Sequence, residues 1–232
     1  MTRTSQDNAP SGAKIRRHAA GQDPAKREQI LKGAMKEFLD KGFDAASMNE
    51  ICRAAGVSKG TIYVYFTDKV DLFEALIADE REQMFQGIEA LLEEDRPLRE
   101  KLILFGHRLA EILCSHRVIR SQRIIAGIVD RMPEVGARFY DAGALRTQAA
   151  LVPLFQREAA AGRIAVPDPG LAGFQFAELV TAGLWRARLF GKRRSPPARA
   201  EIETTVQAAV EMFLRAYGTA PRDSAKHAPD GA

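Results

Sequence analysis

Cysteine and tryptophan are the rarest residues of this 232-residue chain, with two cysteines, Cys52 and Cys114, and a single tryptophan. One cysteine pair cannot build a disulfide framework, and both cysteines lie in apolar periodic stretches, which fits a reducing cytosol. No run reaches the roughly 18 apolar residues that span a bilayer. The polar N-terminus carries no apolar segment typical of a signal peptide. We therefore expect a soluble, cytoplasmic protein.

The motifs of common enzyme classes are also missing. The sequence contains no Gly-rich phosphate loop, no His-Glu-x-x-His and no Cys-x-x-Cys. Cys114-Ser115-His116 is too short and isolated for a metal or nucleophile site, so we expect a packed cysteine and a surface histidine. These gaps predict that the protein is not an enzyme and uses no cofactor or metal.

Charge is nearly balanced, with a formal net charge of +4 and a sequence pI of about 9.2. This excess permits a polyanionic partner without demanding one. Part of it lies in residues 1–22, at Lys14, Arg16 and Arg17. That segment fits two interpretations, a solvated disordered terminus or a basic arm that adds phosphate contacts beside a main DNA site.

Helical periodicity is what the chain does contain. Apolar residues recur at three- and four-residue spacing over most of its length, and no segment alternates as a strand would. We predict an all-α protein of about nine helices. Its expected parts are the arm (1–22), a helix-turn-helix domain (23–70), a second helical domain (71–217) and a disordered tail (218–232).

Proline, glycine and capping residues set the expected helix boundaries. The first helix begins at Pro24 after Asp23 and ends at Gly42, and the long fourth helix extends to near Glu94. Pro153 should kink a later helix. The remaining expected helices span residues 98–115, 116–130, 133–161, 169–191 and 197–217.

Residues 47–69 predict a helix-turn-helix. Ser47 and Glu50 have the spacing of a capping box at the start of a second helix, which Gly56 ends. Ser58 can cap a third helix over residues 59–66, with Ile62 as an inward anchor. Two short helices joined by a tight glycine-containing turn are typical of this DNA-binding motif.

The first turn of the third helix should face base edges, because recognition helices present their N-terminal residues to the major groove. Lysine can reach a guanine or a phosphate, glycine permits close approach, and a threonine methyl suits thymine. Tyrosine hydroxyls and helix N-termini suit phosphates. The predicted DNA-binding residues are Ser47, Lys59, Gly60, Thr61, Tyr63, Tyr65 and Lys69, with Ile62 and Phe66 as anchors.

The order Gly-Val-Ser-Lys-Gly-Thr-Ile-Tyr-Val-Tyr-Phe-x-x-Lys at residues 56–69 resembles the tetracycline-repressor (TetR) family of bacterial transcriptional regulators. The resemblance covers about residues 29–76. Tyr65 departs from it slightly, because histidine is also common there. The later chain resembles the family only in layout and in residues 162–169 and Phe176.

This resemblance implies a nine-helix fold in which three helices bind double-stranded DNA at a palindromic operator and the fourth connects them to a ligand-binding and dimerisation domain. It also implies a homodimer through the last two helices. Six apolar residues there could form the dimer seam or, equally, an intramolecular core: Leu179, Leu184, Val206, Val210, Phe213 and Leu214.

The resemblance further implies that a small-molecule effector enters between the later helices. A kink at Pro153 would widen the bundle there. Aromatic stripes more often form core than pocket, and that alternative stays open. The candidate ligand-binding residues are Phe105, His107, Leu109, Ile112, Ile128, Phe139, Gln148, Phe155, Phe174, Glu178 and Trp185.

These features together predict a sequence-specific DNA-binding regulator. Since members of the family it resembles are usually repressors, we expect a repressor that a small hydrophobic ligand releases from its operator. Two alternatives remain. One is a redox-sensing regulator with Cys52 or Cys114 as the reporter, and the other is an architectural DNA-binding protein without an effector.

Overall fold

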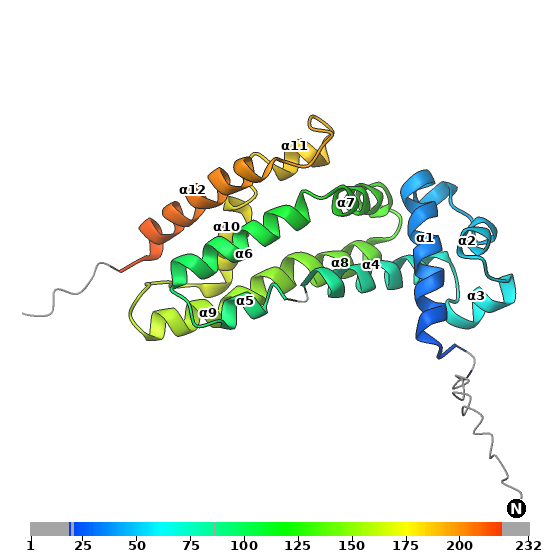
Figure 1. Ribbon diagram of the computed structural model, residues 1–232, viewed down its shortest axis with the longest axis horizontal. Helices are drawn as coiled ribbons and strands as arrows, with labels where there is room; N and C mark the ends of the chain where they lie inside the picture. Colours follow the sequence, from blue (N-terminus) through cyan, green and yellow to red (C-terminus); the bar gives the residue numbers. More distant parts are fainter. Residues whose placement is uncertain (1–18, 20, 86, 220–232) are drawn as a thin grey trace, which may run out of the picture.

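The computed structural model describes residues 19, 21–85 and 87–219, and there the secondary structure is helical apart from one isolated bridge between Ile164 and Gly218. The predicted all-α class is confirmed. Most of the predicted basic arm and tail lies outside the described residues. The helices form an elongated body with a three-helix unit at one end (Figure 1).

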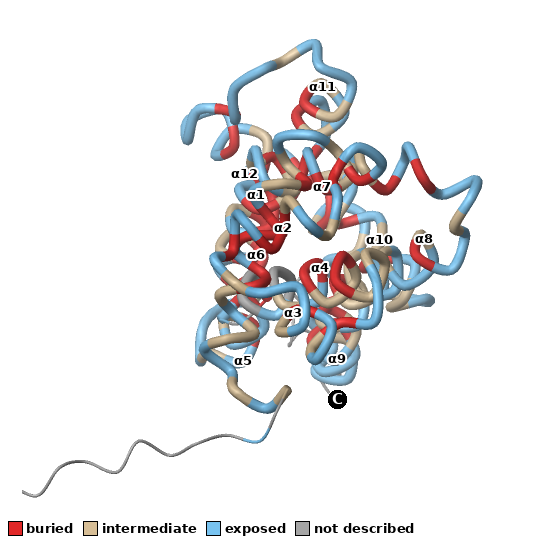
Figure 2. The backbone as a smooth tube through the Cα atoms, turned by 90° about the vertical axis from the view of Figure 1, so that its right-hand side faces the viewer, coloured by how far each residue is buried: buried red, intermediate tan, exposed pale blue. Residues whose placement is uncertain are grey.

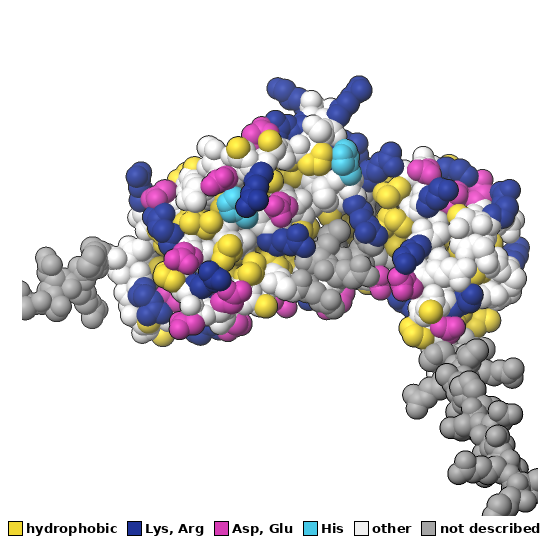
Figure 3. Space-filling view, viewed as in Figure 1, with side chains coloured by type: hydrophobic (Ala, Val, Ile, Leu, Met, Phe, Trp, Pro, Cys, Tyr) yellow, Lys and Arg dark blue, Asp and Glu magenta, His cyan; other side chains and the backbone are white. Residues whose placement is uncertain are grey.

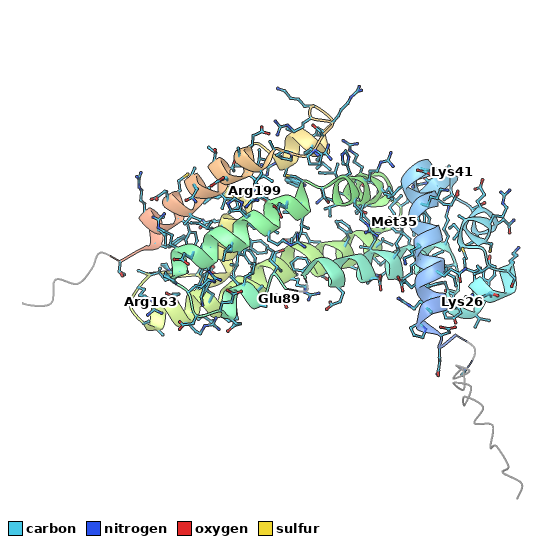
Figure 4. The ribbon with its side chains drawn as sticks, in the orientation of Figure 1. Lys26, Met35, Lys41, Glu89, Arg163 and Arg199 are labelled. Atoms are coloured by element: carbon cyan, nitrogen blue, oxygen red, sulfur yellow. The ribbon has the colours of Figure 1, made fainter. Side chains whose placement is uncertain are left out.

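The three-helix unit consists of α1 (Pro24–Ala45), α2 (Met48–Ala55) and α3 (Lys59–Tyr65). The Asp23 carboxylate caps α1 by accepting hydrogen bonds from the backbone nitrogens of Ala25, at 3.0 Å, and Lys26, at 3.3 Å. Gly42 has non-helical angles (φ 80°), as expected for the end of the regular helix, and one further turn follows it. Lys26 and Lys41 lie near the two ends of α1 (Figure 4).

The body begins with α4, which leaves the three-helix unit and runs beneath the other helices (Figure 1). In chain order the body comprises α4 (Lys69–Phe85), α5 (Ala90–Glu93), α6 (Leu98–Leu113), α7 (His116–Ile128), α8 (Pro133–Tyr140), the π-helical segment η1 (Asp141–Leu145), α9 (Arg146–Ala160), α10 (Pro169–Leu179), α11 (Trp185–Leu189) and α12 (Arg199–Tyr217).

Two predicted helices are interrupted. The fourth helix stops at Phe85 instead of near Glu94, because Gly87 adopts a left-handed conformation (φ 91°) that ends the helix. The predicted helix over 169–191 is split into α10 and α11 by a turn at residues 180–184, where Gly183 is left-handed (φ 74°). Both interruptions come from glycines within apolar periodic sequence, so the periodicity continues where the helix does not.

The irregular backbone expected at Pro153 lies earlier in the chain. Pro153 lies inside α9, but the backbone loosens earlier, at η1. A π-helical segment leaves carbonyl groups without their usual partners, and such segments are frequent at functional sites. Here the Thr147 hydroxyl donates to the carbonyl of Gly143 at 2.9 Å, and this carbonyl also accepts from the backbone nitrogen of Arg146.

Two hydrophobic clusters form the interior (red in Figure 2). The larger one joins α6, α9, α10 and α12 and contains four of the residues considered for a dimer seam, namely Leu184, Val206, Val210 and Phe213. These four are buried within one chain, so their role is intramolecular core. Leu179 and Leu214 pack partly buried against the same cluster.

The second cluster crosses from the three-helix unit into the body. Ile30, Phe38 and Ile62 of the unit belong to the same cluster as Ile125 and Ile128 of α7. Met35 also belongs to it and lies on the side of α1 that faces the body (Figure 4). Because tightly packed interiors transmit displacement, a shift of α7 acts directly on α1.

Polar contacts reinforce this junction. The Arg120 guanidinium on α7 donates to the carbonyl of Leu39 at 2.7 Å, and Arg131 pairs with Asp44 at 2.8 Å. Both contacts reach the second half of α1, just before α2. The three-helix unit is thus held by α7 as well as by its covalent link to α4.

Candidate DNA-binding surface and ligand cavity

The N-terminus of α2 is fixed by the predicted capping box. The Ser47 hydroxyl accepts from the backbone nitrogen of Glu50 at 3.3 Å and donates to the Glu50 carboxylate at 2.8 Å. Lys41 of α1 approaches the same carboxylate at 2.7 Å. The hydrogen bonds from Lys41 and Ser47 lower the pKa of Glu50 to about 2. Ser47 itself stays exposed, with the N-terminus of α2 facing solvent.

The orientation of α3 follows from its cap and its anchors. The Ser58 hydroxyl accepts from the backbone nitrogen of Thr61 at 3.0 Å, and Gly56 makes the preceding turn in the left-handed region (φ 64°). Ile62 is fully buried and Phe66 is 3% exposed, which confirms both as anchors. The opposite face of α3 is therefore turned outward.

That outward face carries Lys59, Gly60 and Tyr63. Tyr63 is 45% exposed, and the Lys59 ammonium lies 6.0 Å from its ring centroid. A β-carbon added at Gly60 would meet only the Ser58 hydroxyl, at 3.8 Å. Since Gly60 is helical and has open space beside it, nothing within the chain requires glycine there.

Thr61 and Tyr65 are less exposed. The Thr61 hydroxyl lies 2.8 Å from that of Ser58, so it already has a partner within the cap. Tyr65 is half-buried and packs against the second cluster. The structure thus brings Ser47 and the α3 residues to one end of the molecule, but their side chains are exposed to solvent to different extents.

Lys69 differs from the prediction of a phosphate contact. Its ammonium group donates to the carbonyls of Phe43, Ala46 and Asp44 at 2.7, 3.0 and 3.2 Å, and it lies 4.5 Å from the Phe43 ring centroid. A lysine ammonium has three N–H donors, and here all three are used. Lys69 therefore braces the α1–α2 connection against α4.

Sequence reasoning missed Arg53 on α2. Its side chain is 79% exposed, and its ion pair with Glu50 is long at 4.0 Å. The helical pattern could have revealed it, because Ile51, Cys52 and Ala55 point inward and leave Arg53 on the outer face. Arg53 adds a positive charge beside the exposed face of α3.

A cavity of about 710 Å³ lies between α4, α6, α7, η1 and α10–α11. Aromatic and aliphatic side chains form most of its wall, and the residues of η1 contribute where the backbone loosens. Six of the predicted ligand-binding residues line it: Leu109, Ile112, Phe139, Phe174, Glu178 and Trp185.

The other five predicted residues do not line this cavity. Phe105 is fully buried near Phe176, and Phe155 stacks on Phe213 with ring centroids 5.0 Å apart. Ile128 belongs to the junction cluster, and Gln148 packs against Gly173. His107 is half-buried elsewhere on α6. These positions serve helix packing, which is the alternative that aromatic periodicity left open.

Of α7, only Ile128 was predicted to bind ligand, and the residues of this helix that line the cavity were missed. Eight residues of α7 and its end contribute, including Arg117, Ser121, Gln122 and Arg123. Polar residues on a helix are as typical of a solvated face as of a ligand site, so their residue types alone do not single them out. The amphipathic pattern of α7 could have shown that one face is neither fully apolar nor fully solvated.

The cysteines have no accessible thiol. Cys114 is fully buried and burial raises the pKa of its thiol to about 11. Cys52 is 7% exposed within the helix-turn-helix core. Within the part of the chain that the structure describes, no group of three or more His, Cys, Asp or Glu residues could hold a metal ion, and no helix is long and apolar enough to cross a membrane.

Two family descriptions match the chain. "Bacterial regulatory proteins, tetR family" matches residues 30–76, and "AefR-like transcriptional repressor, C-terminal domain" matches residues 100–219, more than half of the 232 residues. The chain belongs to the TetR family. The family match thus includes both the helix-turn-helix and the body that holds the cavity.

Individual TetR-family structures agree over most of the chain. A transcriptional regulator from Mesorhizobium loti is 31% identical, with a TM-score of 0.77 over 84% of this chain and 98% of its own. The flavonoid-responsive regulator FrrA is also 31% identical, with a TM-score of 0.69 over 86% of this chain and all of its own.

The activator FasR from Mycolicibacterium smegmatis is 31% identical over 96 residues, which are 41% of this chain and 43% of FasR. The chain thus spans less than half the length of this curated relative.

Proposed function

We propose that this protein is a homodimeric transcriptional repressor that binds a palindromic operator through α2 and α3 and leaves it when a small hydrophobic molecule fills the cavity. The observation that carries the proposal is the position of α7. This helix lines the cavity and also contacts α1 through Arg120 and the shared hydrophobic cluster. Occupancy of the cavity therefore has a physical route to the DNA-binding unit.

The DNA contacts are assigned by exposure. Lys59, Gly60 and Tyr63 face outward on α3 and are the proposed groove-facing residues, with the Thr61 methyl and Tyr65 beside them. Ser47 and Arg53 lie on α2, where the helix N-terminus and the guanidinium favour phosphates. Two copies with recognition helices about 34–36 Å apart would read half-sites one helical turn apart.

The proposed dimer uses the outward faces of the last helices. Leu171 of α10 is 52% exposed and Met212 of α12 is 58% exposed, although both are large and apolar. Small residues, Thr204, Ala208 and Ala216, flank Met212 at four-residue spacing along α12, so another helix could approach closely. We propose these residues in place of the six seam candidates, of which four are buried in the core and Leu179 and Leu214 pack partly buried against it.

The size and lining of the cavity support a small hydrophobic effector. Its volume of about 710 Å³ lies within the roughly 300–1,000 Å³ typical of ligand pockets. FrrA, one of the relatives with matching fold, is described as flavonoid-responsive. A redox mechanism is less well supported, because the Cys114 thiol is buried and its raised pKa disfavours the reactive thiolate.

Selection of bound duplexes from a random DNA pool tests the proposal. The expected result is an enriched inverted repeat that the dimer protects. A variant with Lys59→Ala and Tyr63→Phe should fold normally and lose the enrichment. If the bound duplexes share no symmetric motif, sequence-specific binding is contradicted and an architectural role is favoured.

A further inference from the structure

The polar groups of the cavity wall are distributed unevenly. The Thr147 and Thr181 hydroxyls donate to carbonyls of their own helical segments, at 2.9 Å to Gly143 and 3.1 Å to Ala177. Glu178, an acidic residue of the wall, pairs with Arg186 at 3.1 Å. The side chains of Thr147, Thr181 and Glu178 are therefore already paired within the chain.

The α7 side is different. Ser121 is 9% exposed and lines the cavity, yet among the described residues its hydroxyl makes no hydrogen bond. Gln122 uses only its carbonyl oxygen, which accepts from the Trp185 indole at 2.8 Å, and within the described chain its amide nitrogen has no acceptor. Both groups line the cavity, so a ligand atom that accepts from them gains hydrogen bonds without breaking one within the chain.

Positive charge accompanies these donors. Arg117 lies one helical turn before Ser121 on the same face, and burial lowers its pKa while Asp79 opposes that shift. Arg123 also lines the cavity, and its guanidinium donates to the backbone carbonyls of Arg188 and Leu189 rather than to a carboxylate. Near it, dark-blue Lys and Arg side chains project from the connection between α11 and α12 (Figure 3).

We infer that the effector is an acidic amphiphile, with an apolar body in the cavity and an anionic oxygen head group held on α7 by Ser121, Gln122 and Arg117. The inference rests on the proposed function and names the chemical class of its ligand. The head group accepts hydrogen bonds from the Ser121 hydroxyl and the Gln122 amide, and its charge faces the Arg117 guanidinium. The apolar body lies against Phe85, Phe139 and Phe174.

The single tryptophan of the chain gives a direct readout, because Trp185 lines the cavity and bonds Gln122. Trp185 fluorescence of the full-length protein is titrated with dodecanoate and with 4-phenylbutanoate, each beside its methyl ester. The two acids share the head group and distinguish an aliphatic from an aromatic body. At least one acid should bind about tenfold more tightly than its ester.

Two variants place the head group. Ser121→Ala should weaken binding of the acid about tenfold and that of the ester less, because a carboxylate accepts a stronger hydrogen bond than an ester carbonyl. Alanine is favourable in a helix, so this variant should fold. Thr181→Val is the matched control, because the Thr181 hydroxyl is already satisfied and its loss should not affect the acid. Arg117→Gln should weaken binding of the acid and reduce its dependence on salt.

An ester that binds as tightly as its acid, an acid affinity unchanged by Ser121→Ala, or the absence of any Trp185 response to both acids overturns the inference. An ester that binds as tightly as its acid and releases operator DNA overturns the head group assignment but leaves the proposed function intact. An acid that binds as described without changing operator affinity supports the inference and contradicts the proposed function.

Discussion

The Arg120 guanidinium on α7 donates a 2.7 Å hydrogen bond to the carbonyl oxygen of Leu39 on α1. The next residue of α7, Ser121, lines the cavity. One step along a single helix therefore separates a contact with the DNA-binding unit from a contact with the proposed ligand. A displacement of α7 caused by the ligand has to change its contact with α1.

Arg120→Met should weaken this coupling. Methionine keeps apolar packing but loses the donor, so α7 can shift without moving α1 as strongly. We expect the variant to bind ligand normally by Trp185 fluorescence and to show a several-fold smaller loss of operator affinity at saturation. Anisotropy of a labelled operator with and without ligand measures this loss. An unchanged ligand effect would assign the coupling to α4 or to the hydrophobic cluster that α7 shares with α1.

Gly60→Ala should weaken operator binding without lowering the stability of the fold. The added methyl group meets no clash within the chain, and alanine is favoured in helices by about 0.5–1 kcal/mol over glycine. We expect equal or higher stability to chemical denaturation and at least tenfold weaker operator binding. A variant that binds the operator normally would show that the backbone of α3 does not approach DNA at Gly60.

Lys69→Met should act on stability rather than on phosphate binding. Three backbone carbonyls lose their charged donor, which should cost about 1–3 kcal/mol of unfolding free energy. The salt dependence of DNA binding should keep its slope. Lys59→Met is the matched control, expected to reduce that slope by about 1 with little change in stability. A flatter slope for Lys69→Met would restore its predicted phosphate contact.

The capping box should make stability depend on pH through Glu50. Its folded-state pKa of about 2 lies below the ordinary value of 4.5. The ionised form therefore stabilises the fold above about pH 4.5, and this contribution is lost as the pH falls toward 2. Thermal unfolding should show Glu50→Gln less stable at pH 7, with the difference narrowing below about pH 4.5. A difference constant from pH 7 to pH 3 would contradict this role.

The helix-turn-helix could be predicted closely because its signals are local. Ser47 with Glu50, Gly56 and Ser58 are capping and turn residues whose chemistry acts within four residues of sequence. Their observed hydrogen bonds are the expected ones. The role of Lys69 was not predictable in the same way, because its acceptors lie more than 20 residues away.

The cavity was harder to predict because it too depends on contacts between residues far apart in the sequence. Core and pocket use the same apolar residues, so Phe105 and Phe174 cannot be told apart by spacing, yet only Phe174 lines the cavity. The interruptions at Gly87 and Gly183 depend on how the flanking segments pack, not on periodicity. The polar wall of α7 became recognisable only when the three-dimensional arrangement set Ser121 against an apolar space.

The most direct test of the account is one titration read in two ways. Dodecanoate is added to the protein bound to its selected, labelled operator, and Trp185 fluorescence and operator anisotropy are recorded together. If occupancy of the cavity releases the operator, both signals change with the same midpoint and operator affinity falls at least tenfold. A tenfold fall corresponds to a coupling free energy of about 1.4 kcal/mol between the two sites. A Trp185 signal that saturates while operator affinity stays constant would contradict release of the operator by the ligand.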